Sequence, residues 1–200
     1  NLPAVQLLEH YGSQRFDARL QQVGIRLHYP GDGIPNLALI LGGTGMKLED
    51  LVSAYAALGR NGSTAPLRYQ PDMPLQVRPL TTPGAAWVVQ RILSGHLQPN
   101  STEQRRRQDF AWKTGTSHGH RDALALGVGN GHVIGVWVGR PDGTPVPGQY
   151  GQVSATPLLL QVYDILAQQP GRLTGNPPQP PAVGVAAICW PGGQPLPAND

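Results

Sequence analysis

Residues 110–116 read Phe-Ala-Trp-Lys-Thr-Gly-Thr, and the fold is decided by this stretch and the residues that follow it. Its apolar start predicts a strand over Phe110 to Gly115. A second strand is predicted from Asp122 to Gly129, ending at Asn130-Gly131, a dipeptide that strongly favours a two-residue hairpin turn. A third strand, rich in Val, follows from His132 to Gly139. The pattern predicts an antiparallel meander, and its nearly continuous apolar character predicts that helices cover it.

Helical patterns precede and follow this predicted sheet. The clearest covers Lys47 to Leu58, where apolar residues recur every three or four positions. Prolines in first turns, capping residues and terminal glycines delimit four more helices. These are Pro3 to Tyr11, Ser13 to Val23, Thr82 to Ser94 and Ala155 to Gln168. Helices on either side of a short antiparallel sheet predict an α+β fold.

The composition limits the classes of protein to which the chain can belong. The 200 residues include 26 Gly and 21 Pro but only 14% charged residues, so many turns are expected. A net charge of +3 is too small to indicate nucleic acid as a partner. A single cysteine, Cys189, excludes a disulfide framework, and no apolar run is long enough to span a membrane. Because the chain opens at Asn1 without a Met, we expect a segment of a longer protein.

The character of the sequence changes after Gln169. Prolines become frequent and the helical period is lost, which predicts a semi-rigid linker. Val183 to Trp190 is predicted to start a further module. We therefore predict that residues 1–168 form one domain, that 169–182 form the linker, and that 183–200 begin a small C-terminal β module.

The end of the first strand can hold a carboxylate. Lys113 offers a positive charge with three N–H donors, and strand alternation places the Thr114 and Thr116 hydroxyls on one side. Gly115 allows a ligand or another backbone to approach closely. A carboxylate there would gain charge-assisted hydrogen bonds, and the Thr116 N–H could donate to an oxyanion. The alternative, which composition alone favours, is a solvated strand end.

Two nearby features give weaker signals. His118 and His120 flank Gly119, but the further ligands that a metal site needs are not evident, so a solvated loop is the preferred interpretation. Arg105 to Arg107 could attract an anionic glycan or lipid head group, although a solvated turn is preferred. We predict neither a metal nor a cofactor.

Eight short stretches carry a resemblance to a known family. They are Asn1 to Val5, Leu37 to Gly43, Leu48 to Leu51, Ala54 to Leu58, Lys113 to Thr116, Arg121 to Ala123, Gly135 to Gly143 and Ile188 to Pro191. In this order and spacing they resemble the C-terminal half of the transpeptidase domain of class A (bifunctional) penicillin-binding proteins. Lys113 to Thr116 is similar to the Lys-Thr-Gly motif of active-site-serine penicillin-recognising enzymes.

The resemblance implies serine acyl transfer on peptidoglycan stem peptides that end in D-Ala-D-Ala, with β-lactams as mimics that trap the serine. It assigns a catalytic role to Lys113 and substrate binding to Thr114, Gly115 and Thr116. Asn1 would contact the acyl side chain of the substrate. It also implies a place in the bacterial cell envelope, on the periplasmic side of the inner membrane.

The Ser-x-x-Lys nucleophile motif of such enzymes does not occur in the 200 residues. We therefore expect the chain alone to be inactive, with the missing N-terminal half of the domain as a partner that carries the nucleophile. Two alternatives stay open. One is a non-catalytic module of the penicillin-binding fold that recognises stem peptides or proteins, and the other is a serine β-lactamase.

Overall fold

The protein is described here by a computed structural model. It describes residues 1–94, 109–169, 175–189 and 191–194. At its centre lies an antiparallel sheet of β3 (Ala111–Thr116), β4 (Asp122–Gly129) and β5 (His132–Gly139), in that order. Lys113 pairs with Leu126, which in turn pairs with Gly135. The predicted meander is therefore confirmed, with the hairpin at Asn130-Gly131.

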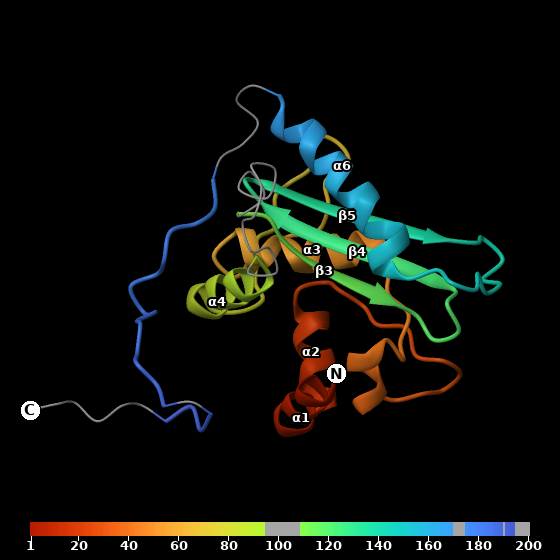
Figure 1. The fold of residues 1–200 in the computed structure, drawn as a ribbon, viewed down its shortest axis with the longest axis horizontal. Helices are drawn as coiled ribbons and strands as arrows, with labels where there is room; N and C mark the ends of the chain where they lie inside the picture. The colour runs from red at the N-terminus through yellow and green to blue at the C-terminus, as the bar shows by residue number, and fades with distance from the viewer. Residues whose placement is uncertain (95–108, 170–174, 190, 195–200) are drawn as a thin grey trace, which may run out of the picture.

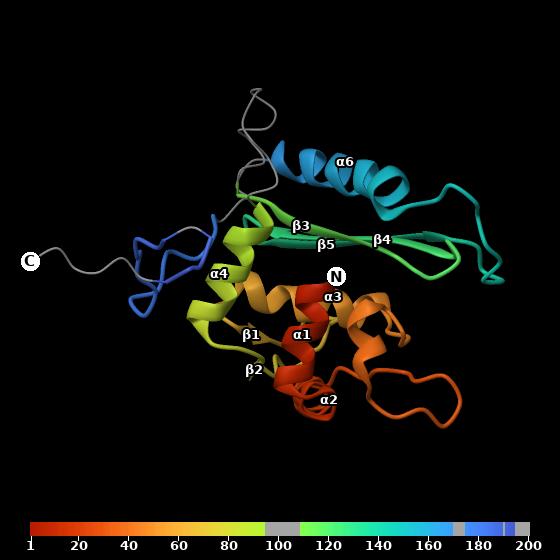
Figure 2. The ribbon, with the colours of Figure 1, turned by 60° about the horizontal axis from the view of Figure 1, so that its bottom comes forward.

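Helices cover both faces of the sheet (Figures 1 and 2). One face packs against α6 (Thr156–Ala167), which is preceded by a π-helical turn, η2 (Gly151–Ala155). The other face packs against α3 (Leu48–Gly59) and α4 (Pro83–Ser94). The predicted α+β fold is thus confirmed as a mixed, layered arrangement.

The remaining elements lie on the α3 side of the sheet. The pair α1 (Leu2–Tyr11) and α2 (Ser13–Gln22) was expected, and Pro3 lies in the first turn of α1. Three short elements were not predicted, because each is too short to show a period. They are the 3-10 helix η1 (Leu37–Leu41) and the two-residue strands β1 (Ser63–Thr64) and β2 (Arg78–Pro79), which pair with each other.

The core between the sheet and α6 is built around Phe110. Its ring stacks on that of Tyr163, with centroids 4.1 Å apart, and both side chains are buried. A side chain at position 127 would overlap the Phe110 ring, so Gly127 is required by this close approach. Ala123 and Ala125 are fully buried and small, and they let α6 and η2 come close to β4.

The apolar residues that helical periodicity predicts to face inward are Val88, Val89 and Ile92 in α4 and Leu158, Leu159, Val162 and Ile165 in α6, and most of them do not. In α4 the apolar set Val88, Val89 and Ile92 is exposed. The side chains that face inward are instead Ala86, Gln90 and Ser94. In α6 the exposed set is Leu158, Val162 and Ile165, whereas Leu159 and Tyr163 are buried. Small and polar residues face inward in α4 because this helix lies close to a sheet whose own residues fill the core, whereas α6 contributes the large side chains of Leu159 and Tyr163 to that core.

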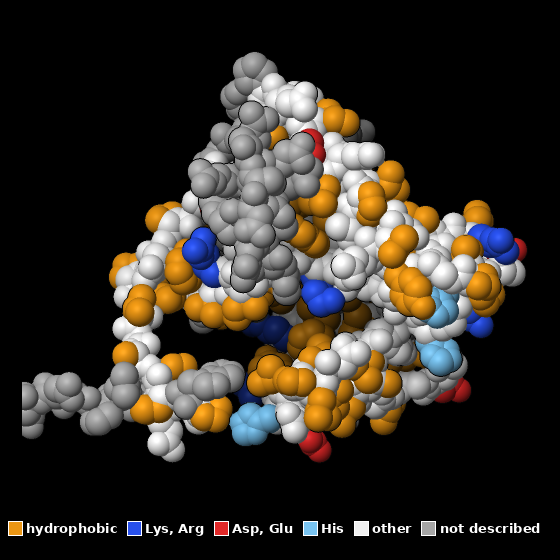
Figure 3. All heavy atoms as spheres, in the orientation of Figure 1, with side chains coloured by type: hydrophobic (Ala, Val, Ile, Leu, Met, Phe, Trp, Pro, Cys, Tyr) orange, Lys and Arg blue, Asp and Glu red, His pale blue; other side chains and the backbone are white. Residues whose placement is uncertain are grey.

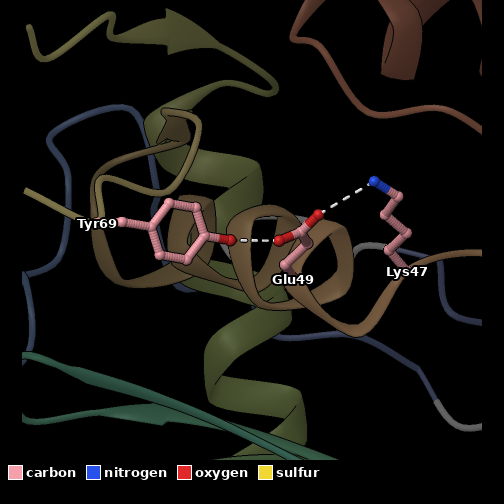
Figure 4. A network of polar contacts seen from close by, with 3 residues as sticks. All are labelled: Lys47, Glu49 and Tyr69. Carbon is pink, nitrogen blue, oxygen red and sulfur yellow. Dashed lines mark hydrogen bonds and ion pairs between the residues drawn. The ribbon is translucent and has the colours of Figure 1, made fainter. Parts of the chain in front are cut away.

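A surface network ties the segment after β1 to the start of α3 (Figure 4). The Tyr69 hydroxyl donates to the Glu49 carboxylate, whose other oxygen lies 3.3 Å from the Lys47 Nζ. The hydrogen bond from Tyr69, and then that from Lys47, lowers the pKa of Glu49 below its ordinary value. Since the contacts are exposed, they fix the path of the chain and add little to the free energy of unfolding.

In α2 a buried carboxylate is satisfied by two neighbours. The Tyr29 hydroxyl donates to Asp17 Oδ1 at 3.0 Å, and the Gln21 Nε2 donates to Oδ2 at 2.7 Å. Desolvation, followed by the hydrogen bond and the negative charge of Asp17, raises the pKa of Tyr29 to about 12. This pair attaches the chain after α2 to the helix.

The C-terminal segment is fastened to the sheet by Asn176. Its side-chain amide donates to Asp109 O at 2.5 Å and accepts from Asn130 N at 2.8 Å. Residues 175–189 contain no helix or strand, and a turn follows in which Cys189 N donates to Gln194 O. The linker and the C-terminal β module stay predictions. No helix in the described ranges is long and apolar enough to cross a membrane.

Replacing Phe110 by Ala removes the stack on Tyr163 and leaves a cavity under α6. We expect a loss of about 3–5 kcal/mol in the free energy of unfolding, measured by urea denaturation of the 200-residue chain. The exposed Val185→Ala variant is the control and should stay within about 0.5 kcal/mol of the parent. A similar stability of both variants would contradict the central place given to the stack.

The raised pKa of Tyr29 predicts a stability change at alkaline pH. The folded state favours the neutral phenol, so its contribution is complete below pH 10 and is lost as the pH rises from 10.0 through about 12. Denaturation curves across this range should therefore fall less steeply with pH for Tyr29→Phe than for the parent. In Asp17→Asn, absorbance titration should give Tyr29 a lower pKa. An unchanged pH dependence in Tyr29→Phe would refute the assignment.

Candidate active site

The Lys-Thr-Gly segment lies on an edge strand. Among the described strands β3 pairs only with β4, so its other edge is open. Ser117 N–H donates to Asp122 O at 3.0 Å, and in an antiparallel pair such bonds involve every second residue. The backbone groups of Lys113 and Gly115 therefore point toward β4. Those of Thr114 and Thr116 point to the open edge, where a ligand can reach them.

The Lys113 ammonium lies at this open edge. Its side chain leaves β3 on the face opposite Thr114 and Thr116, and its Nζ donates to Thr114 O at 2.6 Å. Lys113 is exposed, and an ammonium has three N–H donors, so two remain for a ligand. The positive charge is thus held beside the outward N–H of Thr116.

The two threonine hydroxyls lie on the α6 side of the sheet. Thr116 is exposed, and its Oγ1 accepts the backbone N–H of Gly151 at 3.1 Å. Thr114 and Gly115 are half-buried. The backbone of Gly151 lies close to Gly115 on this face, because a side chain at 151 would lie 2.5 Å from Gly115 O. On the other face a side chain at 115 would meet only Leu124 Cβ, at 3.6 Å, so the close approach expected there stays a prediction.

The loop after β3 is bonded to a distant segment. His120 has a positive φ of 56°, its Nδ1 lies 3.1 Å from Gln149 O, and its ring meets Tyr150 edge-on at 4.7 Å. His120 O also accepts Val146 N–H at 3.0 Å. The solvated loop predicted for both histidines is therefore wrong for His120, while His118 is exposed. Sequence offered no signal for these contacts, which join residues about thirty positions apart.

Asn1 is the N-cap residue of α1 and is exposed, and its side chain makes no capping bond. In both ribbon views the N-terminus lies between α1 and the sheet. The space-filling view shows a hollow between the sheet and the α1–α2 pair, with Lys and Arg side chains on its rim (Figure 3). No hydrogen bond joins Asn1 to residues 113–116 in the described part of the chain, so its predicted role stays a prediction.

The site is an open edge rather than an enclosed cavity. A cavity of about 530 Å³ lies between α3 and residues 65–75, and none of Lys113 to Thr116 lines it. Within the described ranges there is no group of three His, Cys, Asp or Glu side chains that could hold a metal ion. Arg105 to Arg107 lie outside the described residues.

Known proteins share this fold and sequence. No protein-family profile matches the chain. Its structure is similar to that of a class A penicillin-binding protein, penicillin-binding protein 1A from Haemophilus influenzae. The TM-score is 0.65 at 17% sequence identity, over 98% of this chain and 39% of the other. At that identity the likeness concerns the fold.

The sequence is similar to penicillin-binding protein 1C of Escherichia coli (strain K12). The two are 53% identical over 201 aligned residues, which cover all of this chain and 26% of the relative. The recognition of a segment of a class A penicillin-binding protein is therefore confirmed. The chain spans about a quarter of the length of that relative.

Proposed function

We propose that this chain forms the substrate-binding wall of a peptidoglycan D,D-transpeptidase, and that residues outside these 200 supply the attacking serine. The open edge of β3 carries the proposal. It combines the Lys113 ammonium, the outward Thr116 N–H and the Thr116 hydroxyl within four residues. The similarity to penicillin-binding proteins 1A and 1C supports it.

An extended stem peptide would bind along this edge. Main-chain hydrogen bonds to the outward groups of Thr114 and Thr116 would align it as an added strand. The terminal carboxylate would accept hydrogen bonds from the two threonine hydroxyls and face the positive charge of Lys113. These contacts would put the penultimate carbonyl beside the Thr116 N–H, which would donate to the developing oxyanion.

The proposed reaction is acyl transfer in two steps. The serine oxygen forms an ester with the penultimate D-Ala carbonyl carbon, the C–N bond breaks, and the leaving D-Ala nitrogen takes a proton. An amine of a neighbouring stem peptide then attacks the ester and regenerates the serine. In β-lactams the ring amide takes the place of the scissile bond, and the ester persists. We place this activity on the periplasmic side of the bacterial inner membrane.

Two alternatives to this function stay open. The same edge could serve a non-catalytic module that binds stem peptides, if no serine outside these 200 residues reaches it. A serine β-lactamase would use the same edge with a water molecule in place of the amine. The two enzymes and the binding module differ in the covalent chemistry of the complete gene product.

Labelling with a fluorescent penicillin tests the proposal. The purified 200-residue chain should form no covalent adduct, whereas the complete gene product should form one that an excess of unlabelled penicillin prevents. An adduct on the chain alone would refute the external nucleophile. No adduct on the complete, folded product would favour the binding module, and rapid turnover of a chromogenic cephalosporin would favour a β-lactamase.

The role of Lys113 can be tested against a matched control, because the chain has only two lysines, Lys47 and Lys113. In the complete gene product, Lys113→Met should lower the rate constant of penicillin acylation by about 10²-fold, as loss of a charge-assisted contact to the ligand implies. Lys47→Met removes the same charge at the start of α3 and should acylate at the parent rate. If both changes lowered the acylation rate constant equally, Lys113 would act only through its contribution to the net charge of the protein.

A further inference from the structure

We infer that Gly151, outside the recognised motif, is a positioning residue that aims the Thr116 hydroxyl at the substrate carboxylate. The inference rests on the proposed function and deepens it. Gly151 is buried and begins η2, 35 positions after Thr116, and its N–H donates to Thr116 Oγ1 at 3.1 Å.

This hydrogen bond leaves the Thr116 hydroxyl free to donate to a ligand. A threonine oxygen can accept two hydrogen bonds and donate one. With the Gly151 N–H fixed on one side, the side chain is held in one orientation and the O–H hydrogen must point elsewhere. A carboxylate is an acceptor without donors, so a hydroxyl that is already an acceptor toward the protein is prepared to donate to it.

The contact requires glycine at position 151. A Cβ there would lie 2.5 Å from Gly115 O and 2.7 Å from Leu124 O, which are backbone atoms of two paired strands. Backbone of a sheet cannot turn away as a flexible side chain can. A side chain at 151 would therefore lift η2 from the sheet or displace the end of β3, and the 3.1 Å bond to Thr116 would lengthen.

The carbonyl oxygen of Gly151 is hydrogen-bonded to the start of α6. Thr156 Oγ1 donates to Gly151 O at 3.1 Å, and Thr156 is the first residue of that helix. Leu159 and Tyr163 bury α6 in the core, and fully buried Ala155 packs η2 there too. The position of Thr116 is thus set by the core of the domain through Gly151, in addition to the hydrogen bonds of β3.

The test compares a penicillin with its methyl ester, in the complete gene product. Because an ester lacks the carboxylate, the ratio of the two acylation rate constants reports on carboxylate recognition alone. We expect Gly151→Ala to lower this ratio about tenfold, the size of one lost charge-assisted hydrogen bond. A general folding defect would instead lower both rates together and leave the ratio unchanged.

Three further variants separate an effect on the position of Thr116 from an effect of the added side-chain volume at 151. Thr116→Val should lower the ratio similarly, and Gly151→Ala should then have no further effect on it, whereas Thr116→Ser should keep the parent ratio. Thr156→Val removes the hydrogen bond to Gly151 O without adding an atom near β3, and it should lower the ratio two- to threefold even if Gly151→Ala fails to fold. The control is Gly184→Ala, at an open position with an ordinary backbone conformation, where no change is expected.

The outcomes distinguish the inference from the proposed function. If the parent protein is not acylated by penicillin at all, the proposed function fails. If the parent is acylated and prefers the acid, but Gly151→Ala and Thr156→Val keep its ratio, the positioning role of Gly151 is overturned. Additive effects of Gly151→Ala and Thr116→Val would also overturn it, because the two changes would then act through different groups.

Discussion

The alternation of hydrogen bonds between β3 and β4 is the constraint on which the site depends. The bond from Ser117 to Asp122 turns every second residue of β3 toward β4, and the residues between, Thr114 and Thr116, present their backbone groups to the open edge. A shift of one residue in this register would exchange the two sets and direct the Thr116 N–H into the sheet. The stack of Phe110 on Tyr163 and the glycine at 127 oppose such a shift.

The sequence predicted the elements that have a clear period or clear ends. The sheet was predicted from the strand pattern between Phe110 and Gly139 and from the Asn130-Gly131 turn. The helices that cover it were predicted from their periods and their capping residues. The sequence could also group Lys113, Thr114 and Thr116, because they are adjacent. The inward face of α4 was predicted wrongly, since closeness to a sheet favours Ala and Gln where periodicity favours Val and Ile. In α6 the periodicity correctly placed Leu159 in the core but also placed Leu158, Val162 and Ile165 there, which are exposed.

Contacts between distant segments could not be read from the sequence. Gly151 had no signal beyond a glycine before a helical pattern, yet its N–H and its missing side chain both act at the motif. His120 likewise follows the motif closely in sequence, but its partner Gln149 is far along the chain. Such pairs depend on how η2 and α6 lie on the sheet, and only tertiary packing determines this placement.

The two hydrogen bonds of Asn176 have a mechanical consequence. They join the segment after α6 to Asp109, next to the start of β3, and to Asn130 in the β4–β5 turn. A pull on the chain beyond residue 176 therefore acts first on these two bonds and on the end of the sheet to which they attach. The helix α6, and with it the contact between Gly151 and Thr116, is therefore shielded from movement of whatever follows.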